Sequence, residues 1–292
     1  MTAGVISPSL AAVGTLVAIQ SVNSQYHIWF IETSYKRKLS ARQACSIESA
    51  CRINGDYNVH LLSTGNFSSS DCPYYRILSK LPNFCSANLN VSATLAGTPL
   101  GAAEAALDQS PNKVSHLSDF LRYTVLWKRG GVYLDTDVIV IKSLKGIRNT
   151  VCYQKTDKHI KVSSAILFFD KWHPVLGALI DKCARVYDPD LWTTCGPALT
   201  SLLPLDAEFS SRVKFLNVSA FCAVPWEKWE DLFHLGKTPA VLRATNASYG
   251  VHFWNHLSKQ RRVVPGSGCA MDVLARTHCP EVYRRASIEG YF

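Results

Sequence analysis

The sequence lacks several features that mark common classes of protein. It contains no C-x-x-C pair among its ten cysteines, which argues against a zinc ribbon or a dithiol redox motif. Its 292 residues show no internal repeat, no low-complexity tract and no linker, which favours a single domain. Apolar residues make up 47% of the chain, so it can bury a sizeable core and is not a disordered protein.

Positive charge is plentiful but is nowhere concentrated enough to indicate a nucleic-acid-binding surface. The formal net charge is +9, which favours anionic partners such as nucleotides and phosphates. The densest basic runs are Lys36–Lys38 and Lys259–Arg262, and neither is interleaved with aromatic residues. Such short runs are typical of a solvated surface, so we expect no nucleic-acid partner.

The amino terminus lacks both a long apolar run and basic residues. Leu10–Ile19 is its main apolar stretch, whereas a membrane span needs roughly 20 apolar residues. A signal peptide usually begins with basic residues, and no formally charged residue precedes Glu32. We therefore expect residues 1–26 to be a weakly apolar segment, the remnant of a signal or anchor sequence, with the folded domain at residues 27–292.

The cysteines and the glycosylation sequons point to the same compartment. An even number of cysteines at wide spacings is typical of disulfides formed in an oxidising compartment. A buried free thiol is the alternative for some of them, such as Cys183 within a helical pattern. Four N-x-[ST] sequons occur in polar or turn-like stretches, at Asn66, Asn90, Asn217 and Asn246. Together these features favour the lumen of the secretory pathway.

The first part of the chain has the pattern of a β-α-β unit. His27–Ser34 and Tyr57–Thr64 are apolar, strand-like stretches. Between them Ser40–Ile53 has helical spacing, and Ser40 is a residue of the type that caps helices. This order predicts an α/β fold with a nucleotide-binding sheet, whereas residues 65–112 show no pattern that predicts their organisation.

A second helix is predicted for Val114–Gly131. Its apolar residues recur every three or four positions, Ser115 can cap its start, and Gly130 and Gly131 can stop it. Further elements are predicted along the rest of the chain: strands in VYLD (132–135), VIVIKSL (138–144), Ser163–Asp170 and Tyr249–Asn255, and helices opening at Pro174, at Pro197, at Pro225 and near Met271, the last reaching Arg285.

Two aspartates separated by one residue interrupt the apolar stretch Arg129–Val140. On a regular strand Asp135 and Asp137 would face the same side, where their carboxylates could share one hard cation. Mg²⁺ or Mn²⁺ held by carboxylates together with substrate phosphates is common, and open α/β sheets bind ligands at the carboxyl ends of their strands. An ordinary turn with a solvated aspartate pair is the alternative. We interpret the stretch as a helix stop, a short strand and a metal-holding turn.

Asp119 and Arg122 form a second candidate group just upstream. They lie three residues apart on the predicted helix and therefore on one face of it. One interpretation is a surface ion pair of little energetic value. The other is that both side chains reach the same crevice as the aspartate pair and bind sugar hydroxyls, and spacing alone leaves both interpretations open.

The stretch SDFLRYTVLWKRGGVYLDTDVIV (residues 118–140) resembles the S-D-x-x-R…G-G-x-Y-x-D-x-D motif of one glycosyltransferase family. This is the family of the lactosylceramide α-1,4-galactosyltransferases and α-1,4-N-acetylglucosaminyltransferases. Other segments resemble the family in the same order, namely FIETS, ARQACSIESA, FCAVPWEKWEDLF, VHFWN and THCP. The resemblance extends from about Trp29 to Pro280.

The resemblance implies a single domain of the GT-A type, Rossmann-like, with a mixed central sheet flanked by helices. It implies a Golgi transferase, anchored in the membrane, that moves a hexose from a UDP-sugar to a glycolipid or glycoprotein glycan in α-1,4 linkage with retention. A divalent metal, usually Mn²⁺ or else Mg²⁺, would bridge the diphosphate. No carboxylate is evident as a catalytic nucleophile, so departure and attack on the same face of the sugar is the expected mechanism.

The resemblance also implies roles for individual residues. Metal binding is implied for Asp135, Asp137 and His252. Contacts to the nucleotide or the diphosphate are implied for Glu32, Thr33, Ser34, Asp135 and Trp254. Donor-sugar contacts are implied for Asp119, Arg122, Tyr133, Ser163 and Ser164. A core aromatic is the alternative for Tyr133, and a structural histidine is the alternative for His252.

The chain departs from the family pattern at two places. Ser163 and Ser164 stand where the family has an Asn-Gly pair, and serine is shorter and offers fewer hydrogen bonds than asparagine. Thr194 stands where the family has the histidine of W-G-H-x-G-P. Both changes fall where donor or acceptor would be handled, and both leave the metal-binding residues intact. They bear on sugar specificity and on the rate of transfer.

Two other functions are alternatives. The departures motivate a catalytically weakened or silent relative that binds a glycan or a partner transferase. A glycosidase would need two carboxylates flanking its substrate, about 5–9 Å apart, and no suitable acid is evident outside the aspartate pair. The donor sugar stays open between galactose, N-acetylgalactosamine and N-acetylglucosamine.

Overall fold

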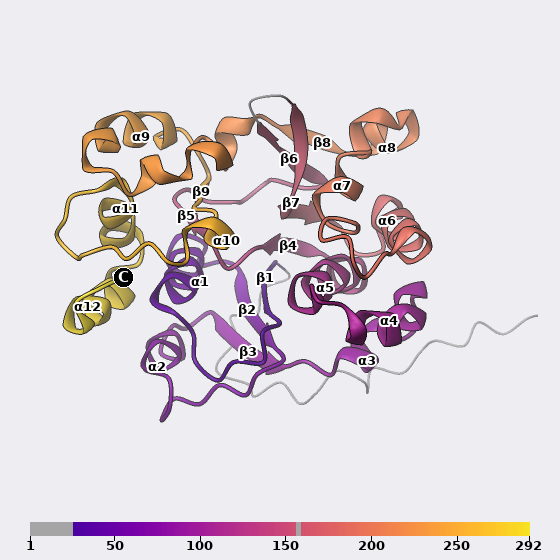
Figure 1. The fold of residues 1–292 in the computed structure, drawn as a ribbon, viewed down its shortest axis with the longest axis horizontal. Helices are drawn as coiled ribbons and strands as arrows, with labels where there is room; N and C mark the ends of the chain where they lie inside the picture. The colour runs from indigo at the N-terminus through magenta and orange to yellow at the C-terminus, as the bar shows by residue number, and fades with distance from the viewer. Residues whose placement is uncertain (1–25, 156–158) are drawn as a thin grey trace, which may run out of the picture.

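The computed structural model describes residues 26–155 and 159–292, which form layers of helices around a central sheet (Figure 1). The apolar segment predicted at residues 1–26 lies outside the described residues except for Tyr26. Within the described part of the chain, none of the helices combines the length and the apolar character that crossing a bilayer requires.

The main sheet is mixed, as predicted. Its strand order is β3-β2-β1-β4-β7-β6-β8. The strands β1, β2, β3 and β4 run parallel to one another, whereas β7 is antiparallel to both β4 and β6. Their bounds are His27–Glu32 for β1, Asn58–Ser63 for β2, Phe84–Asn88 for β3, Gly131–Leu134 for β4, Thr150–Lys155 for β6, Ile160–Phe169 for β7 and Lys214–Leu216 for β8. A separate antiparallel pair joins β5 (Val138–Val140) to β9 (Gly250–His252).

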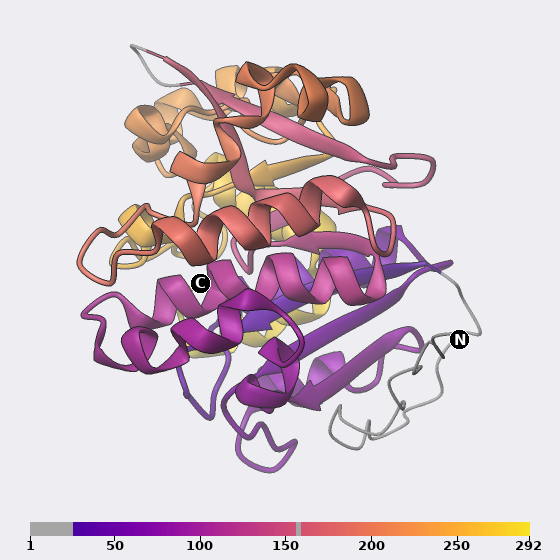
Figure 2. The same ribbon diagram turned by 90° about the vertical axis from the view of Figure 1, so that its right-hand side faces the viewer.

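Alternate residues of the central strands pack into two apolar clusters, one on each face of the sheet. On β1, Ile28 and Phe30 belong to one cluster, whereas Trp29 and Ile31 belong to the other. The first cluster includes residues of α1 (Ala41–Ile53), α11 (Ala270–His278) and α12 (Pro280–Glu289), and the second includes residues of α5 (Lys113–Arg129) and α6 (Pro174–Val186). Figure 1 shows these two groups of helices on opposite sides of the sheet, and Figure 2 looks onto α5 and α6.

The first β-α-β unit forms as the sequence predicts. The helix α1 begins after Ser40, whose side chain accepts a hydrogen bond from the amide of Gln43, and the Gln43 side chain in turn accepts from the Ser40 amide. The strands β1 and β2 then pair in parallel, with Ile28 opposite Val59.

The predicted cap of the second helix is wrong, whereas its predicted stop is confirmed. The helix α5 begins at Lys113, and Asn112 rather than Ser115 is the residue before its first turn. The helix begins three residues before a cap at Ser115 would allow, because the Asn112 carbonyl already accepts from the His116 amide, at 3.0 Å. Gly130 ends the helix with φ +69°, a conformation that glycine adopts without strain.

Several predicted elements differ in extent from those observed. The last helix is two helices, since Pro280 lacks the amide that would continue the hydrogen bonds of α11 into α12. Pro197 opens the single turn α7 (Pro197–Thr200), and Pro225 precedes the 3₁₀ helix η4 (Trp226–Leu232). The remaining short elements are α2 (Pro73–Leu78), α3 (Val91–Leu95), η1 (Pro99–Ala103), α4 (Glu104–Gln109), η2 (Leu203–Leu205), α8 (Ala207–Arg212), η3 (Val218–Ala220), η5 (Leu235–Lys237), α9 (Thr238–Thr245) and α10 (Asn255–Ser258).

Four of the ten cysteines form disulfides. One disulfide joins Cys45 of α1 to Cys279 between α11 and α12, and the other joins Cys183 of α6 to Cys195. The interpretation of Cys183 as a free thiol is therefore wrong. The other six cysteines are buried free thiols, at positions 51, 72, 85, 152, 222 and 269. The asparagines of all four sequons are exposed.

Candidate functional site

The carboxyl ends of three parallel strands meet at one edge of the main sheet. Glu32 ends β1 opposite Ser63, the last residue of β2. On the other side of β1, Trp29 pairs with Tyr133 of β4, so the residues that follow β4 emerge beside the end of β1. Ligands of open α/β sheets bind at such an edge, and the aspartate pair lies there.

Asp135 and Asp137 occupy a turn rather than a regular strand. The β4 strand ends at Leu134, and the Val138 amide donates to the Asp135 carbonyl at 3.2 Å, which closes the turn. The argument from strand alternation is therefore wrong, because no strand runs through these residues. The interpretation of the stretch as a turn after a short strand is confirmed.

The small sheet formed by β5 and β9 brings a distant histidine to the turn. Val138 pairs with His252, and the Phe253 amide donates to the Asp137 carbonyl at 3.0 Å. In consequence Nε2 of His252 lies 3.1 Å from Oδ1 of Asp137. The other carboxylate oxygen of Asp137 accepts a hydrogen bond from the Asn255 amide at 2.7 Å.

The side chains of Asp135, Asp137 and His252 have the geometry of a metal site. One ligand atom from each residue lies within 4.8 Å of the other two. Oδ1 of Asp137 is buried and, among the described residues, receives no well-aligned hydrogen bond despite the nearby imidazole. A buried carboxylate oxygen without a donor is costly, and a cation would remove that cost. These residues therefore fit a divalent metal.

The electrostatics of the pair also favour its charged forms. Burial acts to raise the pKa of Asp137, but His252 and the Asn255 amide outweigh burial and hold that pKa below its ordinary value. Burial acts to lower the pKa of His252, and the carboxylates of Asp137 and then Asp135 raise it above its ordinary value. The carboxylate is thus ready to bind a cation, which would displace the proton of His252.

Arg122 connects the aspartate turn to the preceding helix. Its guanidinium lies 3.2 Å from the Asp119 carboxylate and 3.4 Å from that of Asp135. A second nitrogen donates to the carbonyl and the hydroxyl of Ser164, at 2.9 and 2.8 Å. The guanidinium also lies over the Tyr133 ring, 4.9 Å from its centroid. Because both Asp119 and Arg122 are buried, the interpretation of an exposed surface pair is wrong.

Tyr133 and Ser118 complete the hydrogen bonds of this group. The Tyr133 hydroxyl donates to Oδ1 of Asp135 at 2.5 Å, so Tyr133 is both a core aromatic and a member of the site. The Ser118 hydroxyl lies 3.1 Å from the Tyr133 hydroxyl and accepts from Arg122 at 3.0 Å. Ser118 was not among the predicted site residues, although its position one turn before Arg122 on the same helix face is a signal for it.

Asp119 is the most strongly desolvated carboxylate of the group. Burial raises its pKa to about 6, with Arg122 opposing burial and Asp135 adding to it. The backbone of Gly196 passes so close that a Cβ there would lie 2.9 Å from Oδ2 of Asp119. The Tyr123 hydroxyl donates to the Cys195 carbonyl at 2.7 Å, which fastens this segment to α5.

The residues after β1 lie at the same edge but bond mainly to the chain itself. Both carboxylate oxygens of Glu32 accept hydrogen bonds, one from the Ser34 amide at 2.6 Å and one from the Gln43 side chain. The Thr33 hydroxyl donates to the Val114 carbonyl at 2.7 Å. Among the residues that the structure describes, no hydrogen bond or ion pair joins Glu32, Thr33 or Ser34 to Asp135, Asp137 or His252.

Three further sequence positions have clear structural surroundings. Trp254 packs against His252 with ring centroids 4.0 Å apart and planes tilted by 32°, and it donates its indole hydrogen to the Val224 carbonyl, so it supports the histidine. Ser163 accepts a hydrogen bond from the Ala165 amide, and strand alternation directs its side chain away from that of Ser164. Thr194 donates to the Leu191 carbonyl within its own loop, at 2.8 Å.

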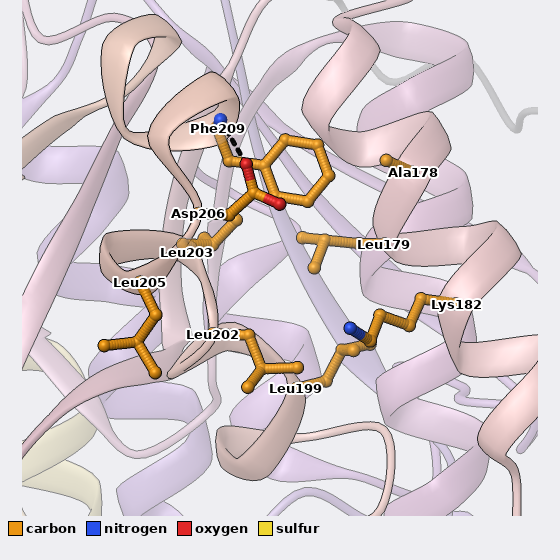
Figure 3. Close-up of a pocket in the computed structure, with 9 residues that line it drawn as sticks. All are labelled: Ala178, Leu179, Lys182, Leu199, Leu202, Leu203, Leu205, Asp206 and Phe209. Carbon is orange, nitrogen blue, oxygen red and sulfur yellow. Dashed lines mark hydrogen bonds between the residues drawn. The ribbon is translucent and has the colours of Figure 1, made fainter.

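An apolar pocket of about 220 Å³ lies away from this group, between α6, α7 and α8 (Figure 3). Most of its lining is aliphatic, including Leu179, Leu199 and Leu203, and one carboxylate oxygen of Asp206 accepts hydrogen bonds from amides in the first turn of α8. None of the predicted site residues lines it. The chemistry of the chain therefore lies at the sheet edge and not in this pocket.

Comparison with known proteins connects this geometry to a family. The lactosylceramide 4-alpha-galactosyltransferase of Rattus norvegicus is 30% identical over 284 residues, covering 92% of this chain and 78% of the relative. The chain belongs to this family of α-1,4-glycosyltransferases. Another member, the human alpha-1,4-N-acetylglucosaminyltransferase, is 30% identical over 277 residues, covering 88% of this chain and 79% of the relative.

Two family models divide the chain between them. The glycosyltransferase sugar-binding region containing the DXD motif matches residues 40–156, and the alpha 1,4-glycosyltransferase conserved region matches residues 168–286. The first includes Asp135-Thr136-Asp137, and the second includes His252. Among solved structures, galactosyltransferase LgtC with donor and acceptor sugar analogues is similar over 89% of this chain and 95% of that one, with 14% identity and a TM-score of 0.49. Membership of this family makes the protein a glycosyltransferase, and its central sheet is mixed, with parallel and antiparallel strands.

Proposed function

We propose that the protein transfers a hexose from a UDP-sugar to a glycan in α-1,4 linkage, in a reaction that depends on a divalent metal and retains the anomeric configuration. The observation that carries the proposal is the group of Asp135, Asp137 and His252 at the carboxyl edge of the sheet. Three carboxylates, counting Asp119, lie there with one arginine and one histidine. This excess of negative charge favours a cation, and a cation in turn favours a diphosphate.

The ligand set suits Mn²⁺ better than Mg²⁺. Mg²⁺ is bound almost entirely by oxygen ligands, whereas His252 would offer an imidazole nitrogen beside the carboxylates of Asp135 and Asp137. When bound, the metal supplies positive charge that stabilises the departing UDP. Trp254, whose ring packs at a tilt against His252, would fix the orientation of that ligand beside the diphosphate.

The residues around Arg122 provide a site for the donor sugar. Asp119 is a hydrogen-bond acceptor for sugar hydroxyls, and Arg122 holds it and Asp135 in fixed positions. Ser164 takes part through its contact with Arg122, whereas Ser163, one position earlier on β7, is directed away from Ser164 and is given no contact to the sugar. We assign Glu32, Thr33 and Ser34 to the uridine, because Glu32 ends β1 and the other two follow it at the same sheet edge.

The mechanism that fits these residues is departure and attack on one face of the sugar. A double displacement would need a carboxylate free to attack the anomeric carbon. Asp119 and Asp135 are both held by Arg122, and Asp137 is held by His252 and Asn255. The arrangement therefore favours electrostatic stabilisation of the leaving group over covalent catalysis.

The disulfides and the glycosylation sequons of the chain favour a location in the lumen of the Golgi. The two disulfides need an oxidising compartment, and the four sequon asparagines are exposed to a glycosylating enzyme. By analogy with the relatives, we assign residues 27–292 to one glycosyltransferase domain that acts at the membrane surface on a glycolipid or glycoprotein glycan.

A donor screen tests the proposal. Purified protein with Mn²⁺ is incubated with UDP-galactose, UDP-N-acetylgalactosamine or UDP-N-acetylglucosamine, each with lactosylceramide or methyl β-lactoside, and UDP release is measured. We expect metal-dependent release with one of the donors and an α-linked product by NMR. No release with any donor, although UDP and Mn²⁺ raise the melting temperature, would instead support a catalytically silent relative.

A further inference from the structure

The loop between α6 and α7 presents a tryptophan that none of the roles above uses. Trp192 is 48% exposed, and its ring stacks on that of His256, with centroids 4.6 Å apart and planes 25° from parallel. A stacked ring has one face covered by its neighbour. An exposure of about half therefore means that the opposite face of the indole is open to solvent.

Chain neighbours of this stacked pair contact the metal and donor residues. His256 follows Asn255, whose amide donates to the Asp137 carboxylate at 2.7 Å. Trp192 in turn precedes Gly196 by four residues, so the chain between them can span at most about 14 Å. The backbone of Gly196 lies against the Asp119 carboxylate. The tryptophan is thus connected on one side to the metal site and on the other to the donor-sugar site.

The loop is held in place, so the exposed ring is presented in a defined position. The disulfide to Cys183 fixes Cys195, whose carbonyl also accepts from Tyr123 at 2.7 Å. Within the loop, the Thr194 hydroxyl donates to the Leu191 carbonyl. Thr194, which stands where the resembled family motif has a histidine, thus closes a turn in the loop that carries Trp192.

We propose that the free face of Trp192 is the surface on which the terminal pyranose of the acceptor stacks, with His256 as its positioning residue. One face of a pyranose presents mainly C–H groups, which pack against an aromatic ring. The donor-sugar group is buried, whereas this ring faces solvent, from which an acceptor glycan arrives. The inference rests on the proposed function, since it assigns the second substrate of the same site.

The test compares Trp192→Ala and Trp192→Phe with Trp172→Ala. Trp172 is a matched control, because it is 51% exposed but lies beyond the carboxyl end of β7, at the opposite end of β4 from the aspartate turn. With methyl β-lactoside as acceptor, we expect Trp192→Ala to raise the acceptor KM by about tenfold or more. The donor KM and kcat should change by less than about threefold, and Trp192→Phe and Trp172→Ala should resemble the wild type.

Two results would overturn the assignment. One is an acceptor KM that Trp192→Ala leaves unchanged, and the other is a donor KM that rises as much as the acceptor KM, which would place the ring against the donor. His256→Ala should raise the acceptor KM without affecting the donor KM, as expected of a residue that only orients the ring.

A binding measurement separates this proposal from the proposed function. Saturation-transfer NMR with UDP and Mg²⁺ reports whether methyl β-galactoside, methyl β-lactoside or methyl N-acetyl-β-glucosaminide binds, with no need for turnover. If no donor supports transfer, the proposed function fails. A saturation-transfer signal from a glycoside in the presence of the wild type, but not of Trp192→Ala, would still support the stacking surface. Equal signals with the two proteins, or no signal with either, would refute it.

Discussion

Replacing Asp119 by asparagine should stabilise the protein while impairing it as a transferase. The Asp119 carboxylate is buried against the backbone of Gly196, and Arg122 is its counter-ion at 3.2 Å. Asparagine has the same shape without the charge. Arg122 keeps its second partner, Asp135, at 3.4 Å, so the substitution leaves no arginine unpaired.

The size of the effect follows from the pKa of Asp119, which burial raises from 3.8 to about 6. The folded chain then holds this proton more tightly than the unfolded chain. Stability that is fully present below about pH 4 is therefore lost as the pH rises through 6. A difference of about two pH units corresponds to roughly 3 kcal/mol. Since the new amide also needs hydrogen-bond partners, we expect Asp119→Asn to gain about 1–3 kcal/mol at pH 7.5.

Urea unfolding of metal-free protein in EDTA measures this gain. The free energies of unfolding of the wild type and of Asp119→Asn should differ most at pH 7.5 and converge toward pH 4. The same variant should lose transfer activity at least tenfold, because an amide is a weaker acceptor for sugar hydroxyls than a carboxylate. A variant that is no more stable than the wild type at pH 7.5, or a difference that does not vary with pH, would refute the reasoning.

Two other substitutions test residues that support the site or stabilise the fold. Gly196→Ala should weaken donor binding at least tenfold, since its Cβ would lie 2.9 Å from the Asp119 carboxylate, whereas Gly55→Ala has open space and should leave the donor KM unchanged. Cys45→Ala should lower the free energy of unfolding by about 3–5 kcal/mol, because its disulfide to Cys279 closes a loop of 234 residues; equal urea midpoints for variant and wild type would contradict this.

Local signals in the sequence predict much of the fold. The capping pair Ser40 and Gln43, the β-α-β order and the helix stop at Gly130 each depend on residues close together in the chain. For the same reason the turn at Asp135 was predicted from its neighbours. The short elements at residues 65–112 were not, because their few residues have no clear period and depend on packing against distant elements: α1 and α12 for α2, α5 for α3 and α4, and α6 for η1.

The long-range contacts of the site could not be derived from spacing. His252 reaches Asp137 only because β9 pairs with β5, and no local pattern specifies that pairing. Their association was predicted from the family resemblance. The burial of Asp119 beneath Gly196 likewise depends on the loop fixed by Cys183 and Cys195. Sequence spacing placed Asp119 and Arg122 on one face but did not show whether that face was buried.

The most direct test of the central claim is calorimetric titration of UDP into the protein with Mn²⁺ and with EDTA. Wild type should bind UDP at least tenfold more tightly with Mn²⁺, and Asp137→Asn should lose that dependence, because it removes a charged ligand of the cation. Asp181→Asn, an exposed position on α6, should behave as wild type. Binding of UDP that is equally tight in EDTA, or a metal dependence that survives in Asp137→Asn, would contradict the account.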